Sequence, residues 1–326
     1  MNTLPDSQAR IVFMGTPGFA VPTLRALLEA PRFRVVGVVT QPDRPAGRGQ
    51  QLQMSPVKRA ALDAGLPVIQ PLRARDPDAL EQLRAWKPDF LIVVAFGQIL
   101  RPEVLAVPRI APINVHASLL PRWRGAAPIQ AAIRAGDQYT GVTTMVMDEG
   151  LDTGPILLQD SIPIDPRETG QTLHDKLAPL GALLLIHTLE WLLNGSIAPH
   201  PQPDNPALIS YAPPLKKEDG VLNWTSSAAA IDRHVRAFDP WPGTFTTWNG
   251  RRLKILAGIP ADANLGLAPG QVAETRGTPL AELSPLAIGT GEGVYLPTRL
   301  QLEGRQPLDA ATFLRGAPDF PGSVLG

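Results

Sequence analysis

The sequence contains no cysteine among its 326 residues. That absence excludes disulfides, thiolate metal sites and a cysteine nucleophile. Basic and acidic residues balance at 30 each, so no net charge points to a polyanion or a membrane surface as the partner. No apolar run approaches the ~20 residues of a membrane span, and the first ten residues lack the core of a signal peptide. We therefore expect a soluble, cytoplasmic and monomeric protein that is long enough for two domains.

Strand-like and helix-like segments alternate through the first half of the chain, the pattern of a doubly wound, Rossmann-like α/β sheet. Strands are predicted at 10–15, 35–40, 66–70, 90–96, 110–116 and 141–147, and helices at 21–30, 55–64, 77–86 and 127–135. A longer apolar helix follows at 169–194, where Pro179 is expected to kink or divide it. We place the catalytic domain of this α/β class at residues 1–197.

A different texture begins after a proline-rich segment at 198–208, which is predicted to be a semi-rigid linker. In the second domain, residues 209–326, a helix at 226–238 precedes short strands. These strands are predicted at 243–248, 251–259, 270–274, 286–290 and 293–298. Five short strands suggest a mostly β, OB-like barrel, a fold that often binds oligonucleotides.

RNA binding by this second domain would need a one-sided patch, because it carries eleven basic and eleven acidic residues. The basic residues that could form such a patch are Lys216, Lys217, Arg251, Arg252 and Lys254. An ordinary solvated face is the competing interpretation for each of them.

Asn114 and His116 alternate with aliphatic residues in the strand predicted at 110–116. A period of two puts both side chains on one face, at the carboxyl end where open α/β sheets keep their sites. Asp152 follows in a glycine-punctuated loop after the strand at 141–147. If the two strands are neighbours, its carboxylate can reach the imidazole, fix its tautomer and favour its protonated form. The alternatives are a satisfied buried polar pair and ordinary turn chemistry.

The residues after His116 form a predicted turn, Ser118 to Pro121, whose backbone can hydrogen-bond a flat heterocycle. The next three residues, Arg122 to Arg124, are expected to lie at the surface. On the neighbouring strand, Gly97 follows the apolar run at 90–96 and would let a ligand approach the backbone.

A long loop rich in proline and glycine is predicted at 41–53, and it holds Arg44 and Arg48. Between residues 41 and 59, four basic residues stand against Asp43 alone. Loops of this length are uncommon in compact domains and are often functional. The loop is either a solvated surface feature or a basic contact for an anionic macromolecule.

Three motifs together resemble the folate-dependent formyltransferases: Asn114-Val-His-Ala-Ser-Leu-Leu-Pro121, Gly125-Ala-Ala-Pro-Ile-Gln130 and Asp152-Thr-Gly154. The resemblance runs from about Arg10 to the C-terminal region. Within the family, the loop at 41–49 and the second domain are most similar to the members that act on aminoacyl-tRNA. The resemblance implies transfer of the formyl group of 10-formyltetrahydrofolate, a co-substrate, to the α-amine of methionyl initiator tRNA.

Catalytic roles are expected for Asn114 as a donor to the oxyanion, for His116 in stabilising it and moving the amine proton, and for Asp152 in orienting His116. No metal is required, and the sequence offers no convincing ligand cluster. The resemblance implies a folate site lined by Ser118, Leu119, Leu120, Pro121, Phe96 and Gly97. It also implies that Arg44 and Arg48 hold the tRNA acceptor end, although Gln50 and Gln51 stand where lysines often follow in relatives.

The sequence is also compatible with four other functions. A formyltransferase for a sugar nucleotide or small amine would share the catalytic residues but would not need the basic loop. A hydrolase that releases formate from the same folate would use water in place of the amine. A non-enzymatic RNA-binding module would not need the catalytic set. A nicotinamide oxidoreductase is the least favoured, because Pro17 removes a phosphate-binding amide and Gln41 stands where an acid would bind ribose.

Overall fold

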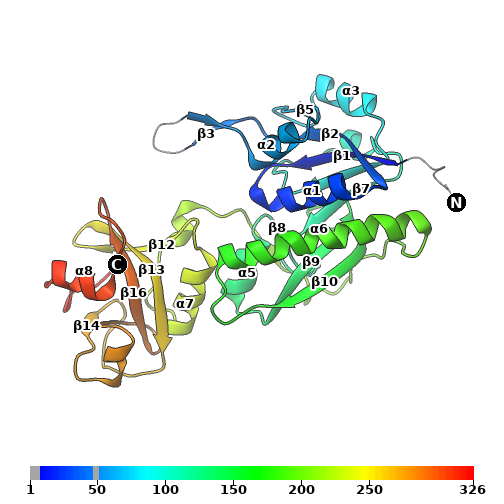
Figure 1. The fold of residues 1–326 in the computed structure, drawn as a ribbon. Helices are drawn as coiled ribbons and strands as arrows, with labels where there is room; N and C mark the ends of the chain where they lie inside the picture. Colours follow the sequence, from blue (N-terminus) through cyan, green and yellow to red (C-terminus); the bar gives the residue numbers. More distant parts are fainter. Residues whose placement is uncertain (1–7, 47–50) are drawn as a thin grey trace. The chain divides into compact units, whose positions relative to one another are not determined.

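The computed structural model describes residues 8–46 and 51–326 (Figure 1). These residues form two compact units. The first unit extends to Pro128 and also contains Tyr139–Pro163 and His174–Pro213. The second unit contains Ile129–Gln138, Ile164–Leu173 and Pro214–Gly326. The catalytic domain, linker and second domain predicted from the sequence stay predictions.

The first unit is built on a seven-stranded sheet in the order β10-β9-β7-β6-β1-β2-β5. Its strands are β1 (Ala9–Gly15), β2 (Phe33–Val39), β5 (Val68–Ile69), β6 (Phe90–Val94), β7 (Ala111–His116), β9 (Tyr139–Val146) and β10 (Ile156–Pro163). The strands from β5 to β7 are parallel, whereas β9 and β10 each run antiparallel to the preceding neighbour. The chain moves from β1 to one edge and then returns to β6 on the other side. The switch point is therefore between β1 and β6, where ligands bind in such sheets.

Helices cover this mostly parallel sheet because each strand alternates buried side chains between two faces. The helices of this unit are η1 (Gly18–Ala20), α1 (Val21–Glu29), α2 (Pro56–Asp63), α3 (Pro77–Ala85), α4 (Pro102–Leu105) and most of α6 (Gly170–Asn194). Helix α5 (Pro128–Ala135) lies almost entirely in the second unit. On one face, Met14 and Val93 share a core cluster with Leu83 of α3. Helix α6 packs closely on β7, since a Cβ at Gly181 would lie 2.9 Å from Val115. Alternation then turns Asn114 and His116 to the opposite face of β7.

All six predicted strands and four predicted shorter helices of the first half are confirmed, with boundaries that differ by at most two residues. The edge strand β10 was not predicted, because its exposed residues Gln159 to Ser161 interrupt the apolar alternation. The expected long loop at 41–53 is instead partly a ribbon, in which β3 (Arg44–Ala46) pairs antiparallel with β4 (Gln51–Gln53). Pro179 does not divide α6, which is one helix of 25 residues.

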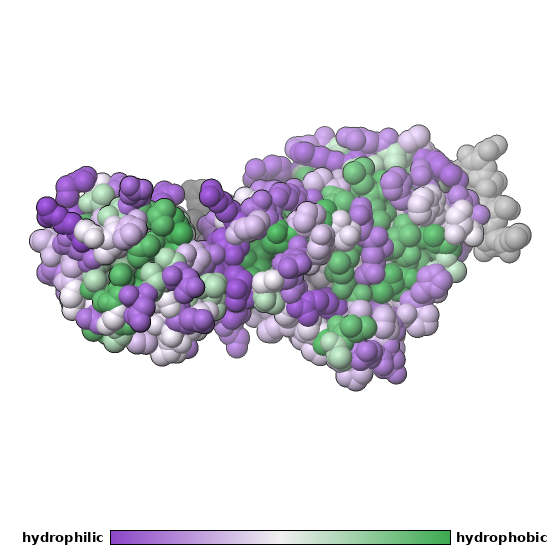
Figure 2. Space-filling model, turned by 90° about the horizontal axis from the view of Figure 1, so that it is seen from below, coloured by the Kyte–Doolittle hydropathy of each residue, from purple (hydrophilic) through white to green (hydrophobic). Residues whose placement is uncertain are grey.

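Helix α6 is long and apolar enough to cross a membrane by length and composition, although the sequence had suggested no such segment. Its buried leucines, among them Leu177, Leu185 and Leu189, belong to the protein core. Leu183 and Trp191 of the same helix are exposed. The face of the molecule in Figure 2 likewise shows hydrophobic surface between hydrophilic residues. Packing of one side against the sheet accounts for much of the apolar character of the helix.

The second unit is mostly β, with strands in the order β12-β13-β16-β15-β14 and β17 paired to β16. Its elements are η2 (Lys217–Gly220), α7 (Ala228–Ala237), β12 (Thr244–Trp248), β13 (Arg251–Ala261), β14 (Val272–Glu274), η3 (Pro279–Glu282), β15 (Leu286–Gly289), β16 (Val294–Leu302), β17 (Leu308–Asp309) and α8 (Ala310–Gly316). The predicted helix and five strands are confirmed, while β17 and α8 were not predicted. Asn249 and Gly250, both at positive φ, form the turn between β12 and β13, as the Asn-Gly pair predicts.

The core of this unit contains a buried hydroxyl group without a partner. Tyr295 is fully buried, and its Oη has no hydrogen-bond partner among the residues that the structure describes. Burial, with a further contribution from the Asp232 carboxylate, raises the pKa of the Tyr295 hydroxyl above its ordinary range, so the group stays neutral. A buried polar group without a partner costs free energy of folding.

We predict that Tyr295→Phe stabilises the protein, because it removes this unpaired hydroxyl and keeps the ring. The expected gain in unfolding free energy is about 1 kcal/mol, measured by urea denaturation with an unchanged m-value. Tyr139→Phe is the control, since Tyr139 is exposed and its replacement should change little. A less stable Tyr295→Phe variant would show that the hydroxyl is used.

Candidate active site at the carboxyl ends of the parallel strands

The structure brings together the three predicted catalytic residues. Strand β9 pairs with β7, with Asn114 opposite Met145 and His116 opposite Thr143, so the two strands are neighbours as the prediction required. The loop after β9 places Asp152 beside β7. Its Oδ2 lies 3.7 Å from His116 Nδ1, and its Oδ1 lies 3.5 Å from Asn114 Nδ2. An amide, an imidazole and a carboxylate therefore share one site.

Burial and backbone contacts fix the position of these groups. Asn114 and His116 are 8% and 6% exposed. Asp152 Oδ2 accepts a hydrogen bond of 2.8 Å from the backbone N–H of Gly125. Because water is largely excluded, a charge at this point interacts more strongly with its neighbours than it would in solvent.

A carbonyl group that the sequence did not predict orients His116. Its Nε2 lies 2.9 Å from the carbonyl oxygen of Trp123, so Nε2 must carry the proton and donate. Trp123 adopts a left-handed backbone conformation with φ 61°, and its N–H donates to Ser210 Oγ at 2.9 Å. The tautomer is therefore set from the Trp123 side, and Nδ1 is directed toward Asp152.

The turn at Ser118 to Pro121 is rigid, because its polar groups have partners within the chain. Ser118 Oγ donates to the carbonyl of Arg122 at 2.6 Å, and Thr143 Oγ1 donates to the carbonyl of Ser118 at 2.6 Å. The N–H of Leu120 donates to Thr143 Oγ1, and Gln159 donates to the carbonyl of Leu120. Leu119 is half-buried, whereas Ser118 and Leu120 are buried. Folate binding by these residues stays a prediction.

The strand β6 is the parallel neighbour of β7 on the side away from β9 and β10, the two strands that this turn contacts. Phe96 is buried, and Gly97 is exposed at φ 81°. Their carbonyl oxygens accept hydrogen bonds of 3.1 and 2.9 Å from the side chain of Gln41, which follows β2. Thr16, which follows β1, also donates to the carbonyl of Phe96. The absence of an acid at position 41 argues against ribose binding, but nothing in the sequence predicts these contacts of the Gln41 side chain.

The basic residues of the 41–59 stretch are partly paired. Arg44 is exposed and donates to Gln41 Oε1 at 2.8 Å. Lys58 forms an ion pair with Asp43, and this contact together with a hydrogen bond from Gln70 lowers the pKa of Asp43. Arg48 lies outside the residues that the structure describes, as does Gln50.

In the second unit, the predicted basic residues do not all share one face. Lys216 and Lys217 are exposed where η2 begins. Arg252 and Lys254 alternate along β13 with buried residues and face outward, and the Arg252 guanidinium lies 4.3 Å from the centre of the Phe245 ring. Arg251 belongs to the other side of the strand and donates to the carbonyl of Glu303.

Arg124 corrects one expectation, since it is buried and does not lie at the surface. Its Nε and Nη2 donate to Oε1 of Gln202, at 3.1 and 2.7 Å. Gln202 comes from the proline-rich segment at 198–208, which the sequence predicts to be a linker. Its side chain also reaches the Asp152 loop. No local sequence pattern predicts such a long-range contact.

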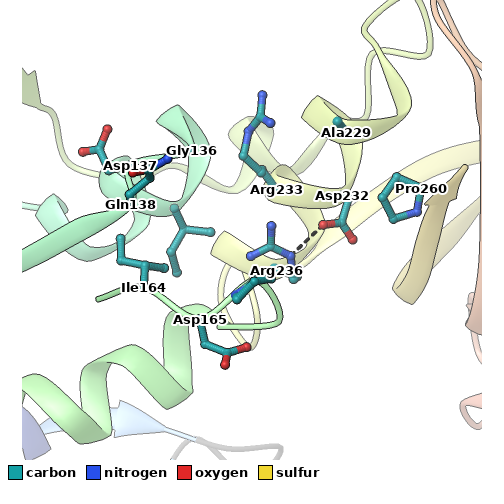
Figure 3. Close-up of a pocket in the computed structure, with 12 residues that line it drawn as sticks. Gly136, Asp137, Gln138, Ile164, Asp165, Ala229, Asp232, Arg233, Arg236 and Pro260 are labelled. Carbon is teal, nitrogen blue, oxygen red and sulfur yellow. Dashed lines mark hydrogen bonds and ion pairs between the residues drawn. The ribbon is translucent and has the colours of Figure 1, made fainter. Parts of the chain in front are cut away.

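A separate cavity of about 330 Å³ lies in the second unit, where α5, residues 164–166 and α7 meet (Figure 3). It contains none of the predicted site residues. Asp232 and Arg236 form an ion pair of 2.7 Å at its wall. Burial raises the pKa of Asp232 even though Arg236 opposes this effect. Since Arg236 also donates to the carbonyl of Glu168, these residues connect neighbouring elements of the unit.

The chain is similar to known proteins over nearly its whole length. Residues 9–189 match the family model described as formyl transferase, and residues 214–318 match that of the formyl transferase C-terminal domain. A methionyl-tRNA formyltransferase from Pelotomaculum thermopropionicum is 47% identical over 97% of this chain and 98% of its own length. That of Geobacter sulfurreducens is 46% identical over 97% of this chain and 96% of its own.

Solved structures with lower identity share the fold. An N-formyltransferase from Helicobacter canadensis, in complex with folinic acid and dTDP-3-aminofucose, is 19% identical with a TM-score of 0.65. The match covers 92% of this chain and 100% of that one. HypX from Aquifex aeolicus, in complex with tetrahydrofolic acid, is 19% identical with a TM-score of 0.60. The match covers 94% of this chain and 47% of HypX, so this chain spans about half of that protein.

Proposed function

The chain belongs to the formyl transferase family, and we propose that it transfers the formyl group of 10-formyltetrahydrofolate to the α-amine of methionyl initiator tRNA. The observation that carries the proposal is the meeting of Asn114, His116 and Asp152 at the carboxyl ends of the parallel strands. It occurs in a chain that is similar over nearly its whole length to methionyl-tRNA formyltransferases.

In the proposed reaction, the neutral amine of the methionyl group attacks the formyl carbon. Asn114 Nδ2 donates a hydrogen bond to the oxyanion that forms, which stabilises the tetrahedral intermediate. His116 stabilises the same negative charge and accepts the proton that the amine loses. It then passes this proton to the folate nitrogen, which departs as the bond between that nitrogen and the formyl carbon breaks. Asp152 orients His116 and supports its positive charge. The products are formylmethionyl-tRNA and tetrahydrofolate.

The formyl donor is proposed to bind along the turn at Ser118 to Pro121 and the strand end at Phe96 and Gly97. Both segments follow the carboxyl ends of parallel strands, β7 and β6, where ligands of open α/β sheets bind. The backbone of Gly97 is exposed and carries no side chain, so a flat ring system can approach it closely. Side-chain contacts from Thr16 and Gln41 hold this strand end in place.

We assign tRNA contacts to Arg44 and Arg48 of the first domain and to Lys216, Lys217, Arg251 and Arg252 of the second. Exposure supports this role for Arg44, Lys216 and Lys217, and an outward position on β13 supports it for Arg252. In this proposal, the first sheet is a doubly wound, Rossmann-like fold and the second is an OB-like barrel. A cytoplasmic location follows from the tRNA substrate.

The test of the proposed function is a formylation assay that offers 10-formyltetrahydrofolate with methionyl initiator tRNA, free methionine or an amino-sugar nucleotide. We expect formylmethionyl-tRNA as the only formylated product. Formylation of the sugar alone would contradict the tRNA assignment but would be consistent with the proposed formyl-transfer reaction. Release of formate without an acceptor would identify a hydrolase.

The tRNA surface generates a second prediction, on the salt dependence of binding. Arg252→Ala should weaken tRNA binding and reduce the slope of log Kd against log salt by about 1, as expected when one phosphate contact is lost. Arg251→Ala should have a smaller effect, because Arg251 belongs to the other side of β13 and already donates to Glu303. Filter binding over a potassium chloride series measures both.

Arg276→Ala serves as the control, since Arg276 is an exposed arginine of the same unit that is not assigned to the surface. An unchanged slope for Arg252→Ala, or equal losses for all three variants, would contradict the assignment.

A further inference from the structure

The backbone of Asp152 is held in an uncommon conformation. Its φ is 52°, in the left-handed region that residues other than glycine rarely adopt. Such a conformation persists where the surroundings hold it, and it is often found at functional sites. The direction of the Asp152 carboxylate depends on this conformation, so the groups that hold the backbone also aim the side chain.

The side-chain amide of Gln202 binds the backbone of this loop. Its Nε2 donates to the carbonyl of Asp152 at 2.7 Å and to the carbonyl of Gly154 at 2.9 Å. Its Oε1 accepts both hydrogen bonds from the buried Arg124 guanidinium. An amide has two N–H donors and one carbonyl oxygen, and every one of these groups is used. Neither a carboxylate nor an apolar side chain can make the same set of contacts.

The segment that carries Gln202 is itself anchored on both sides. His200 exchanges two backbone hydrogen bonds of 2.8 Å with Ile156. Further along the chain, β11 (Tyr211–Ala212) pairs with β8 (Arg124–Gly125). The family models end at residue 189 and begin again at residue 214, so Gln202 lies outside both. Its contacts nevertheless reach the residue proposed to orient the imidazole.

From these contacts we propose that Gln202 is a positioning residue for Asp152. It holds the 147–155 loop in the left-handed conformation that directs the carboxylate to Asn114 and His116. Gly125 binds the carboxylate itself, whereas Gln202 binds the backbone on either side of Thr153. This inference rests on the proposed function, and its prediction is a loss of turnover without a loss of substrate binding.

The test compares Gln202→Met and Gln202→Glu in the full-length protein. Methionine has a similar length but removes all four hydrogen bonds, whereas glutamate keeps an acceptor for Arg124 and removes the two donors. Each variant should lower kcat by up to about 100-fold, since small displacements of catalytic groups have effects of this size. KM for 10-formyltetrahydrofolate and for methionyl-tRNA should change by less than about 3-fold, because uniform binding is retained. If the methionine variant does not fold, the glutamate variant provides the test.

Gln301→Met is the matched control. Gln301 also donates from its side-chain amide to a backbone carbonyl, that of Arg305, but in the second unit. Its kcat should equal that of the wild type. Hydrogen exchange of the peptide covering residues 147–155 should accelerate in both Gln202 variants and stay unchanged in the control. Unchanged exchange would overturn the inference.

A double-mutant cycle separates action through Asp152 from a general structural role. In an Asp152→Asn background, Gln202→Met should lower kcat by less than about 3-fold further, because coupled residues are not additive. A full multiplicative loss would overturn the positioning role. Wild-type turnover in both Gln202 variants, with loss in Asp152→Asn, would reject the inference and keep the proposed function. Full activity of Asp152→Asn would reject the catalytic assignment on which both depend.

Discussion

The carboxylate of Asp152 is the group on which the site depends. One of its oxygens accepts from the Gly125 N–H, and its two oxygens lie 3.5 and 3.7 Å from the side chains of Asn114 and His116. A buried charge is costly unless hydrogen bonds and opposite charge compensate it. Two of the groups beside the carboxylate, the side chains of Asn114 and His116, are also those that the proposed reaction uses. The conformation of the 147–155 loop that stabilises the buried carboxylate is therefore also the one that the proposed reaction needs.

The sheet topology explains why the site is assembled where it is. Thr16, Gln41, Phe96 and His116 lie at the carboxyl ends of β1, β2, β6 and β7, on the same side of the sheet. The order of strands reverses between β1 and β6. The connections that follow these two strands therefore leave their carboxyl ends in opposite directions. The antiparallel addition of β9 and β10 then places the Asp152 loop beside β7. Residues that are far apart in the sequence therefore meet at these strand ends.

The sequence was sufficient to predict the parts of the structure that follow from periodicity. Apart from β10, the strands of the seven-stranded sheet alternate or are continuously apolar, and the shared face of Asn114 and His116 follows from a period of two. Asp152 could be added because a glycine-rich loop followed a predicted neighbouring strand. The turn at Asn249 and Gly250 is typical of the Asn-Gly pair, which readily adopts two positive φ angles.

The remaining features depend on contacts between side chains and distant backbone groups. Nothing local predicts that the Trp123 carbonyl binds His116, or that Gln202 binds Arg124 and the Asp152 loop. The proline content around Gln202 indicated an extended segment but not the surface on which it lies. The β3–β4 ribbon was missed because proline and glycine weaken the strand pattern. These contacts become visible only once the topology is known.

The most direct measurement of the central claim is a single-turnover experiment on His116→Ala, combined with its dissociation constant for 10-formyltetrahydrofolate. His200→Ala is the control, since His200 is exposed in the same unit. We predict that His116→Ala slows the formyl-transfer step by at least about 100-fold, the scale of positioned acid–base catalysis. Folate binding should stay within about 3-fold of the wild type, because the interaction belongs to the transition state. An unchanged transfer rate with weakened folate binding would contradict the account, since His116 would then be a binding residue and the chemistry would lie elsewhere.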